Sequence, residues 1–344
     1  MTLDPPTIGT TTTVHAKLSY IDCTKEFNSP GHMFLARGSL YIARRSTIMS
    51  SANKPPTQSM PSIGLGTFKL KGEAVQQVLR DAIRIGYRHI DTATIYRNEK
   101  DIGDVLQETY SDPSNTLTRS DFWITSKLSP YDMRKPRESL MQTLRSLQTE
   151  YLDLYLIHWP AVARKAASSP EHKRLRLEAW KVLNEAKREG LLRNIGVSNF
   201  TPQHIQELID ETEYGIQGVF VQMETHPWYW RDAFEIQNRF QEHEVRIVGY
   251  ALLAEGRLVG ENCPKFLDEV SKRRGLSVVQ VVLAWALSKN WGVLVRSERE
   301  EHLRDNLEAT RLVDVLTPED IALIESISTS EKEEKLCWDP RFVK

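Results

Sequence analysis

Cysteines and long apolar runs are both scarce in this sequence, and each scarcity excludes a class of protein. The 344 residues include three cysteines, Cys23, Cys263 and Cys337, which are far apart and form no C-x-x-C pair. A disulfide framework or a cysteine-based zinc site is therefore unsupported, and a reducing compartment is expected. Since no apolar run reaches the roughly 18 residues of a membrane span, we expect no membrane association.

Charge of one sign is not in excess either. Lys and Arg number 45 and Asp and Glu number 46, which gives a formal net charge of −1. Nucleic acids are polyanions that attract basic surfaces, so we expect no nucleic-acid partner. The length suits one large α/β barrel or two medium-sized domains, and a monomer is the default expectation.

The N-terminal region lacks hydrophobic periodicity and is rich in Thr, Ser and Pro. This composition predicts a disordered extension over residues 1–55, followed by a folded domain over residues 56–344. A secretory signal is excluded because Arg37 interrupts the one apolar stretch. The arginines among Ser and Thr leave a mitochondrial presequence open, but Asp4 and Asp22 oppose it, so a cytoplasmic location is expected.

Eight short apolar segments, each predicted to be a strand, follow one another from Met60 onward. They cover residues 63–68, 88–93, 122–128, 152–159, 194–200, 219–225, 246–252 and 292–297. Helical patterns between them cover residues 74–86, 136–148, 178–190, 202–212, 233–243 and 278–290. Nearly continuous apolar strands are typical of parallel sheets buried on both faces. Eight strand–helix units in about 250 residues predict a (β/α)8 TIM barrel.

A doubly wound nucleotide-binding sheet is the alternative fold. It normally carries a phosphate-binding loop with three glycines after its first strand. The first strand here offers Gly64 and Gly66, but no third glycine follows at the required place. The dinucleotide fingerprint is therefore absent, which favours the barrel.

Polar residues follow the predicted strands at the point where each strand ends, and in barrel enzymes these ends form the active site. In chain order they are Asp91, Tyr96, Lys127, His158, Ser198, Asn199, Gln222, Tyr250, Arg296 and Ser297. Each alone has an ordinary explanation, such as a solvated lysine or a helix-capping aspartate. Four ionisable residues at the ends of three consecutive strands together indicate one catalytic site.

Several segments in a fixed order resemble the aldo-keto reductase family from about Met60 to the C-terminus. They are MPSIGLGTFKL, GYRHIDTATIYRNEKDIG, ITSKL, YLDLYLIHWP, IGVSNF and the stretch from Gln222 to Pro227. The resemblance implies a barrel preceded by an N-terminal hairpin. It also implies reduction of an aldehyde or ketone to the alcohol with NADPH.

By this resemblance, Asp91, Tyr96, Lys127 and His158 are the catalytic residues. Ser198, Asn199 and Gln222 would hold the nicotinamide carboxamide, and Tyr250 would stack on the nicotinamide ring.

Elementary chemistry supports those catalytic roles. Hydride transfer leaves negative charge on the carbonyl oxygen, which a proton donor must neutralise. A tyrosine hydroxyl has a reference pKa of about 10. We expect the ammonium of Lys127 to lower the pKa of Tyr96, Asp91 to pair with Lys127, and His158 to orient the carbonyl.

The end of the eighth strand departs from the family pattern. Arg296 stands where a lysine is usual, and His302 stands where an arginine is expected. The planar guanidinium of Arg296 can donate two parallel hydrogen bonds to a 2′-phosphate, which a lysine cannot do. Ser297 follows Arg296 in the sequence. His302 is mostly neutral at pH 7, so one positive charge is lost. Asn306 would contact the adenine side. NADPH is therefore the expected cofactor, and NADH stays possible.

The predicted substrate pocket is aromatic and would take a small-molecule carbonyl compound. Its candidate wall residues are Phe68, Trp159, Trp228 and Tyr229, which favour flat or apolar substrates. Trp228 or Tyr229 could instead pack under a loop. The tail at 335–344 could fold over the pocket and shape its specificity, but the sequence does not place it.

Two other functions fit parts of the pattern. A regulatory protein that binds NADPH as a sensor, with little turnover, could share the fold. The intact set of catalytic residue types favours the enzyme. An unrelated barrel, such as a phosphate-sugar lyase or isomerase, is disfavoured because no carboxylate pair or metal-ligand cluster stands out. No H-E-x-x-H motif occurs, so no metal is expected.

Overall fold

A computed structural model describes residues 59–330 and 334–344, which belong to one compact unit spanning Pro55–Lys344. The predicted disordered extension, with its presequence alternative, lies outside the described residues. The N-terminal hairpin expected at the opening of MPSIGLGTFKL is not seen in the described residues. Residues 59–62, directly before the first strand, form no strand.

Eight parallel strands close into a barrel in chain order, each paired with the next and the last with the first. The strands are β1 (Ile63–Gly66), β2 (His89–Asp91), β3 (Trp123–Leu128), β4 (Leu152–Ile157), β5 (Leu192–Ser198), β6 (Phe220–Glu224), β7 (Arg246–Tyr250) and β8 (Gly292–Val295). The predicted (β/α)8 barrel is thereby confirmed. Most strands end two residues earlier than the sequence suggests, so His158, Asn199 and Arg296 lie just beyond them.

The strands are almost entirely buried, as their apolar composition requires. Inside the barrel, large side chains from alternating strand positions pack together and leave no channel. This inner cluster consists of Trp123, Leu154, Leu156, Phe220, Val248 and Leu294, with Met60 and Tyr250 packed against it. A Cβ at Gly292 would lie 2.5 Å from the Met60 methyl, so a larger residue there would displace the end of the flexible Met60 side chain.

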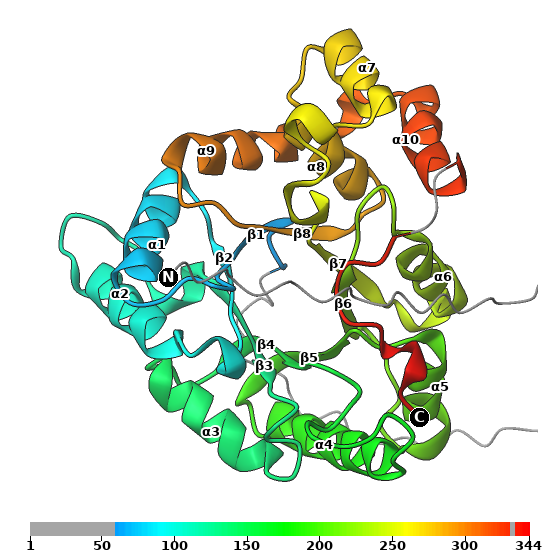
Figure 1. The fold of residues 1–344 in the computed structure, drawn as a ribbon. Coiled ribbons are helices and arrows are strands. Elements are labelled where there is room, and N and C mark those ends of the chain that lie inside the picture. The colour runs from blue at the N-terminus through cyan, green and yellow to red at the C-terminus, as the bar shows by residue number, and fades with distance from the viewer. Residues whose placement is uncertain (1–58, 331–333) are drawn as a thin grey trace, which may run out of the picture. The chain divides into compact units, whose positions relative to one another are not determined.

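Helices surround the barrel (Figure 1). They are α1 (Glu73–Ile85), α2 (Glu99–Ser111), α3 (Pro136–Ser146), α4 (Glu171–Arg188), α5 (Pro202–Glu211), α6 (Arg231–Arg239), α7 (Lys265–Arg274), α8 (Val278–Ser288), α9 (Glu300–Glu308) and α10 (Pro318–Ser330). The sequence did not predict α2, α7, α9 or α10. Helix α4 begins seven residues before the predicted 178–190, because its first turn is polar and only its later turns show apolar periodicity.

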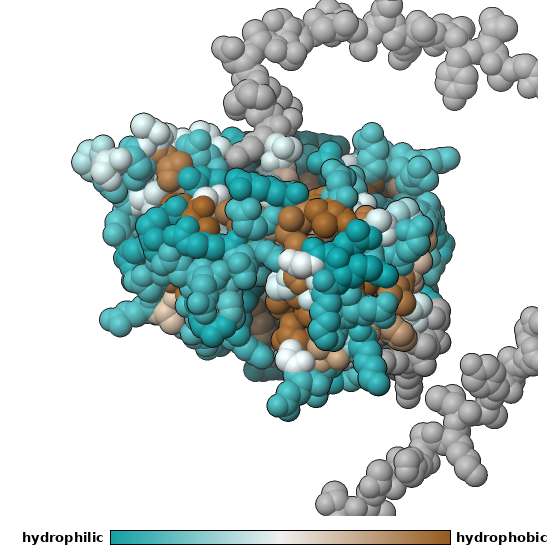
Figure 2. Space-filling view, turned by 90° about the horizontal axis from the view of Figure 1, so that it is seen from above, coloured by the Kyte–Doolittle hydropathy of each residue, from teal (hydrophilic) through white to brown (hydrophobic). Residues whose placement is uncertain are grey.

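The outer surfaces of these helices are mainly polar. Figure 2 shows one side of the molecule, where hydrophilic groups cover most of the surface and hydrophobic groups are visible in separate patches. None of the helices in the described residues is long and apolar enough to cross a membrane.

The C-terminal segment, residues 334–344, ends the fold. It runs past β7 and β6 toward α5 (Figure 1, red). Leu336 and Cys337 donate their backbone N–H groups to Glu224 in β6. At the far end, Lys344 donates its backbone N–H to the carbonyl of Ala167. The sequence left this segment unplaced.

Candidate active site

The ends of β2, β3 and β4 bring the four predicted catalytic residues together. Asp91 is the last residue of β2, Lys127 lies near the end of β3, and His158 directly follows β4. Tyr96 closes the short 3-10 helix η1 (Thr94–Tyr96) after β2. The Thr94 hydroxyl donates to the carbonyl of Lys127 at 2.9 Å, which holds this turn against β3.

Lys127 and Asp91 form a buried ion pair. The Lys127 Nζ lies 2.5 Å from Asp91 Oδ1 and also donates to the carbonyl of Thr92 at 2.7 Å. The Lys127 side chain is fully buried. Burial raises the pKa of Asp91 and lowers that of Lys127, while their mutual attraction opposes both changes. The Gln222 amide donates to the other Asp91 oxygen at 2.8 Å, so Gln222 is joined to the catalytic set.

Tyr96 keeps its proton more firmly than the sequence suggests. Burial, and then the negative charge of Asp91, raise the pKa of its hydroxyl well above the ordinary value. The Lys127 ammonium lies over the Tyr96 ring, 5.1 Å from its centre, while its charge is paired with Asp91. The net shift of the Tyr96 pKa is therefore upward, opposite to the lowering that the sequence suggests. Tyr96 is partly exposed and is a neutral acid at the barrel mouth.

His158 lies beside Tyr96 and is uncharged at neutral pH. The two ring centres are 5.7 Å apart in an edge-to-face arrangement. Burial lowers the pKa of His158 well below its ordinary value, and the nearby Lys127 charge lowers it further. Its Nδ1 atom is buried and has no hydrogen-bond partner. His158 is thus a neutral polar group that can contact a substrate oxygen.

The residues expected to hold the nicotinamide ring lie at the ends of β5, β6 and β7. Asn199 follows β5 in the left-handed backbone region, with φ of 62°. Its amide donates to the His158 carbonyl at 3.1 Å and to the Ser198 hydroxyl at 3.0 Å. Tyr250 donates its hydroxyl to the Asn199 Oδ1 at 2.6 Å. The four predicted positions therefore form one connected edge of the mouth beside the catalytic set.

The residues predicted to hold the phosphates lie between β8 and α9. Arg296 is exposed and donates to the carbonyl of Phe68 at 3.2 Å. Ser297 accepts from the backbone N–H of Arg299 at 3.0 Å, which shapes the turn into α9. Arg299 contacts both His302 and Glu301, so part of its charge is already balanced. Asn306 is buried in α9.

These residues fit a dinucleotide. A flat ring at Tyr250, a hydroxyl at Ser198 and amides at Asn199 and Gln222 suit a nicotinamide with its carboxamide. The guanidinium of Arg296 is exposed and, within the described residues, donates to a carbonyl, which suits a phosphate. The aromatic and anion-binding groups follow different strands of one barrel edge, as an extended cofactor requires.

Aromatic side chains form the wall around Tyr96. The Phe68 ring centre lies 5.1 Å from that of Tyr96, and Trp159 stacks beside His158. Trp338, from the C-terminal segment, packs edge-on against Trp159 at 5.0 Å. Phe68 and Trp338 are each about half exposed. Together these rings form a flat, apolar surface next to the acid.

The other two predicted wall residues lie after β6 and pack against their neighbours. Trp228 is half-buried and contacts the edge of His226. Tyr229 is buried, and its hydroxyl donates to Asp232. The ammonium of Lys335 lies 4.5 Å from the Tyr229 ring centre. Tyr229 therefore supports the C-terminal segment, as the packing alternative anticipated.

Sequence reasoning missed Trp338, Cys337 and Glu224. The first two belong to a segment without periodicity, so no pattern could place them. Cys337 lies close enough to Tyr250 to contribute, after burial, to the raised pKa of that tyrosine. Glu224 carried one usable signal, since a charged residue inside an apolar strand must find partners when buried.

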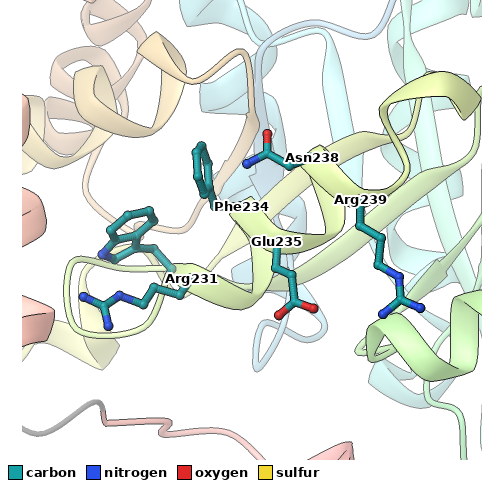
Figure 3. A pocket seen from close by; sticks show the side chains of 6 residues that line it. Arg231, Phe234, Glu235, Asn238 and Arg239 are labelled. Atoms are coloured by element: carbon teal, nitrogen blue, oxygen red, sulfur yellow. The ribbon is translucent and has the colours of Figure 1, made fainter. Parts of the chain in front are cut away.

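The described residues contain no group of three or more His, Cys, Asp or Glu that could hold a metal. A pocket of about 630 Å³ lies elsewhere, on the face of α6 near Phe234 and Arg239 (Figure 3). It includes none of the residues at the barrel mouth, so it is separate from the candidate site.

The fold and this set of side chains agree with a comparison against known proteins. A model of the aldo/keto reductase family matches residues 62–329. The chain belongs to the aldo/keto reductase family. Members of this family act on carbonyl or alcohol groups as NADP-dependent oxidoreductases, which confirms the predicted family and enzyme class.

Related aldo/keto reductases cover most of the chain. The methylglyoxal reductase DkgA of Escherichia coli is 34% identical over 249 residues, which are 72% of this chain and 83% of the relative. The aldose reductase of Encephalitozoon cuniculi is 30% identical and covers 80% of this chain and 92% of its own length. A crystal structure of a Gox0644 variant in complex with NADPH is 27% identical, with a TM-score of 0.70, covering 83% of this chain and 95% of the other.

Proposed function

We propose that this protein reduces an aldehyde or ketone to the alcohol with NADPH, and that Tyr96 donates the proton. One observation carries the proposal: a protonated tyrosine, a neutral histidine and a buried Lys127–Asp91 pair meet at the barrel mouth. An acid, a hydrogen-bond donor and a nearby positive charge are what a carbonyl oxygen requires as it becomes negative.

Each residue has a distinct role in this mechanism. The substrate oxygen lies between the Tyr96 hydroxyl and His158, which orients it. Bound NADPH supplies the hydride to the carbonyl carbon. As charge develops on the oxygen, Tyr96 gives up its proton, and the Lys127 ammonium stabilises the resulting phenolate. Asp91 keeps Lys127 charged and in place, and Gln222 fixes Asp91.

The cofactor would lie across the ends of β5 to β8. Tyr250 would stack on the nicotinamide, while Ser198, Asn199 and Gln222 fix its carboxamide. Arg296 would bind the 2′-phosphate, Ser297 would lie beside it, and Asn306 would face the adenine. NADPH is preferred because Arg296 offers an exposed, permanent positive charge to the 2′-phosphate. The contact of Arg299 with His302 reduces the further positive charge offered there, so NADH serves as a weaker cofactor.

The substrate class follows from the aromatic wall. Phe68, Trp159 and Trp338 favour flat or apolar carbonyl compounds. The relatives named methylglyoxal reductase suggest that small aldehydes are also accepted.

The test is NADPH oxidation with 4-nitrobenzaldehyde and with methylglyoxal, using the native protein and Tyr96→Phe. We expect turnover by the native protein and a loss of about 10²- to 10⁴-fold in the variant, the usual range for a general acid. Tyr151→Phe is the matched control, because Tyr151 lies just before β4, at the opposite end of the barrel from the mouth. Equal activity of Tyr96→Phe and the native protein would remove Tyr96 as the acid. NADPH binding without turnover of any aldehyde would favour the sensor alternative.

A further inference from the structure

The C-terminal segment is fastened to the barrel by polar groups at both of its ends. At its start, Glu224 receives three hydrogen bonds: from the Lys335 ammonium at 2.5 Å, the Leu336 N–H at 2.6 Å and the Cys337 N–H at 3.1 Å. Glu224 is fully buried and Lys335 nearly so. A buried carboxylate with three donors is a strong, specific contact.

The far end of the segment is held by different residues. His204 in α5 donates to the carbonyl of Val343 at 3.0 Å. The fully buried Arg176 in α4 donates to the carbonyl of Lys344 at 3.2 Å. Trp338 lies between the two fastenings and packs against Trp159. Trp338 itself lies outside regular structure, just before a short 3-10 helix (Pro340–Phe342), so these fastenings hold the stretch of chain that carries the ring.

Glu224 also accepts a hydrogen bond from His226 at 3.1 Å, which orients the carboxylate within β6 and the turn after it. Hydrogen bonds from His226 and Lys335 hold the pKa of Glu224 at about 2 in spite of its burial, so the anchor stays charged. Glu224 lies two residues after Gln222, which contacts Asp91. Strand β6 thus carries both Gln222, which belongs to the candidate cofactor site, and Glu224, which holds the C-terminal segment.

We propose that Glu224 is a positioning residue for substrate selection: it fastens the C-terminal segment so that Trp338 stands beside Trp159 and widens the aromatic wall. This inference rests on the proposed carbonyl reduction. Glu224 does not touch the reacting atoms. It lowers the KM of flat aromatic aldehydes through Trp338 and leaves small aldehydes unaffected.

The test begins with Glu224→Gln, which keeps the shape of the side chain but replaces one acceptor oxygen by a donor. Hydrogen exchange at the amides of Leu336 and Cys337 should become roughly tenfold faster, since one amide loses its acceptor oxygen and the other keeps only a neutral, weaker one. KM for 4-nitrobenzaldehyde should rise about five- to tenfold, the scale of one lost aromatic contact. KM for methylglyoxal and kcat for both substrates should stay within about twofold.

Three further variants separate positioning from general damage. Glu334→Gln is the matched control, because Glu334 lies in the same segment but forms only an exposed pair with Arg257. It should change neither exchange nor KM. Lys335→Gln weakens the anchor from the segment side and tests the inference should Glu224→Gln fail to fold. Trp338→Ala should raise KM for 4-nitrobenzaldehyde as Glu224→Gln does, and the double variant should raise it no further.

The outcomes are distinct. Unchanged exchange in Glu224→Gln and Lys335→Gln overturns the anchor. Faster exchange with an unchanged KM for 4-nitrobenzaldehyde overturns the role in selection, as does an additive double variant. If the native protein reduces neither aldehyde, the proposed function fails, and the exchange measurement still decides whether Glu224 fastens the segment.

Discussion

The two ends of the barrel both bury a carboxylate, but they surround it differently. At the base, Asp153 near the start of β4 accepts from Arg119 at 2.7 Å, from Arg193 at 3.0 Å and from the N–H of Ile124 at 2.9 Å. At the mouth, Asp91 faces one ammonium and one amide. The Tyr96 hydroxyl and the His158 imidazole lie nearby, and within the described residues no hydrogen bond joins either of them to Asp91.

The carboxylate at the base therefore has two cationic partners and a backbone donor, whereas the mouth keeps Tyr96 and His158 beside the Asp91–Lys127 pair. Tyr151 strengthens the base further, because its ring lies between the guanidinium groups of Arg119 and Arg193, at 4.0 and 3.9 Å. In a barrel enzyme, polar groups at the base serve stability and those at the mouth serve chemistry. The difference can be tested at each end.

The largest expected effect belongs to Lys127→Met at the mouth. Losing the ammonium should lower kcat/KM about 10³-fold, because the phenolate of Tyr96 loses its stabilising charge. Stability should fall as well, because Asp91 stays buried without its cation. NADPH oxidation and thermal unfolding measure the two quantities. A large fall in Tm with native activity would reverse the comparison.

At the base, Asp153→Asn should lower stability and leave catalysis unchanged. Arg119 and Arg193 would lose a fully buried anionic partner, at a cost of about 3 kcal/mol in unfolding free energy. The kcat/KM of the folded protein should stay native. Urea unfolding gives the first number and the aldehyde assay the second. An intact unfolding curve with impaired catalysis would show that the base takes part in the chemistry.

The buried histidines predict how stability depends on pH. Burial lowers the pKa of His89 to about 3 and that of His204 to about 4. Below about pH 6.5 the unfolded chain binds protons that the folded protein does not bind. The free energy of unfolding therefore falls by up to about 1.4 kcal/mol for each histidine with every unit by which the pH is lowered. Above pH 6.5 both states are neutral and this contribution is complete. Unfolding at pH 7, 6 and 5 should show the slope, and His89→Gln should reduce it; an unchanged slope would rule His89 out as its source.

The smallest effect is expected at the rim of the mouth, with Arg296→Ala. The KM for NADPH should rise about tenfold and that for NADH should stay the same, because only NADPH offers a 2′-phosphate to the guanidinium. Both values come from cofactor titrations at fixed aldehyde. Equal increases for the two cofactors would place Arg296 on the shared pyrophosphate instead.

The sequence predicted the barrel and the convergence of the four catalytic residues because both depend on local pattern. Apolar strands of regular spacing must be buried, and the polar residues at their ends then share one edge. Helix α2 was not predicted, although Ile102, Val105 and Leu106 follow the spacing of a buried helical face. The disorder and targeting predictions for residues 1–55 stay predictions, as do the monomeric state and the cytoplasmic location.

The sequence by itself thus determined the fold and the family, and it predicted which side chains meet at the barrel mouth. Only the tertiary structure decided their electrostatics, because a pKa depends on burial and on charges that meet across strands. Burial and the charge of Asp91 raise the pKa of Tyr96 well above its ordinary value. The structure alone also placed Trp338, since the C-terminal segment has no periodicity and takes its position from Glu224, Arg176 and His204 in three separate elements.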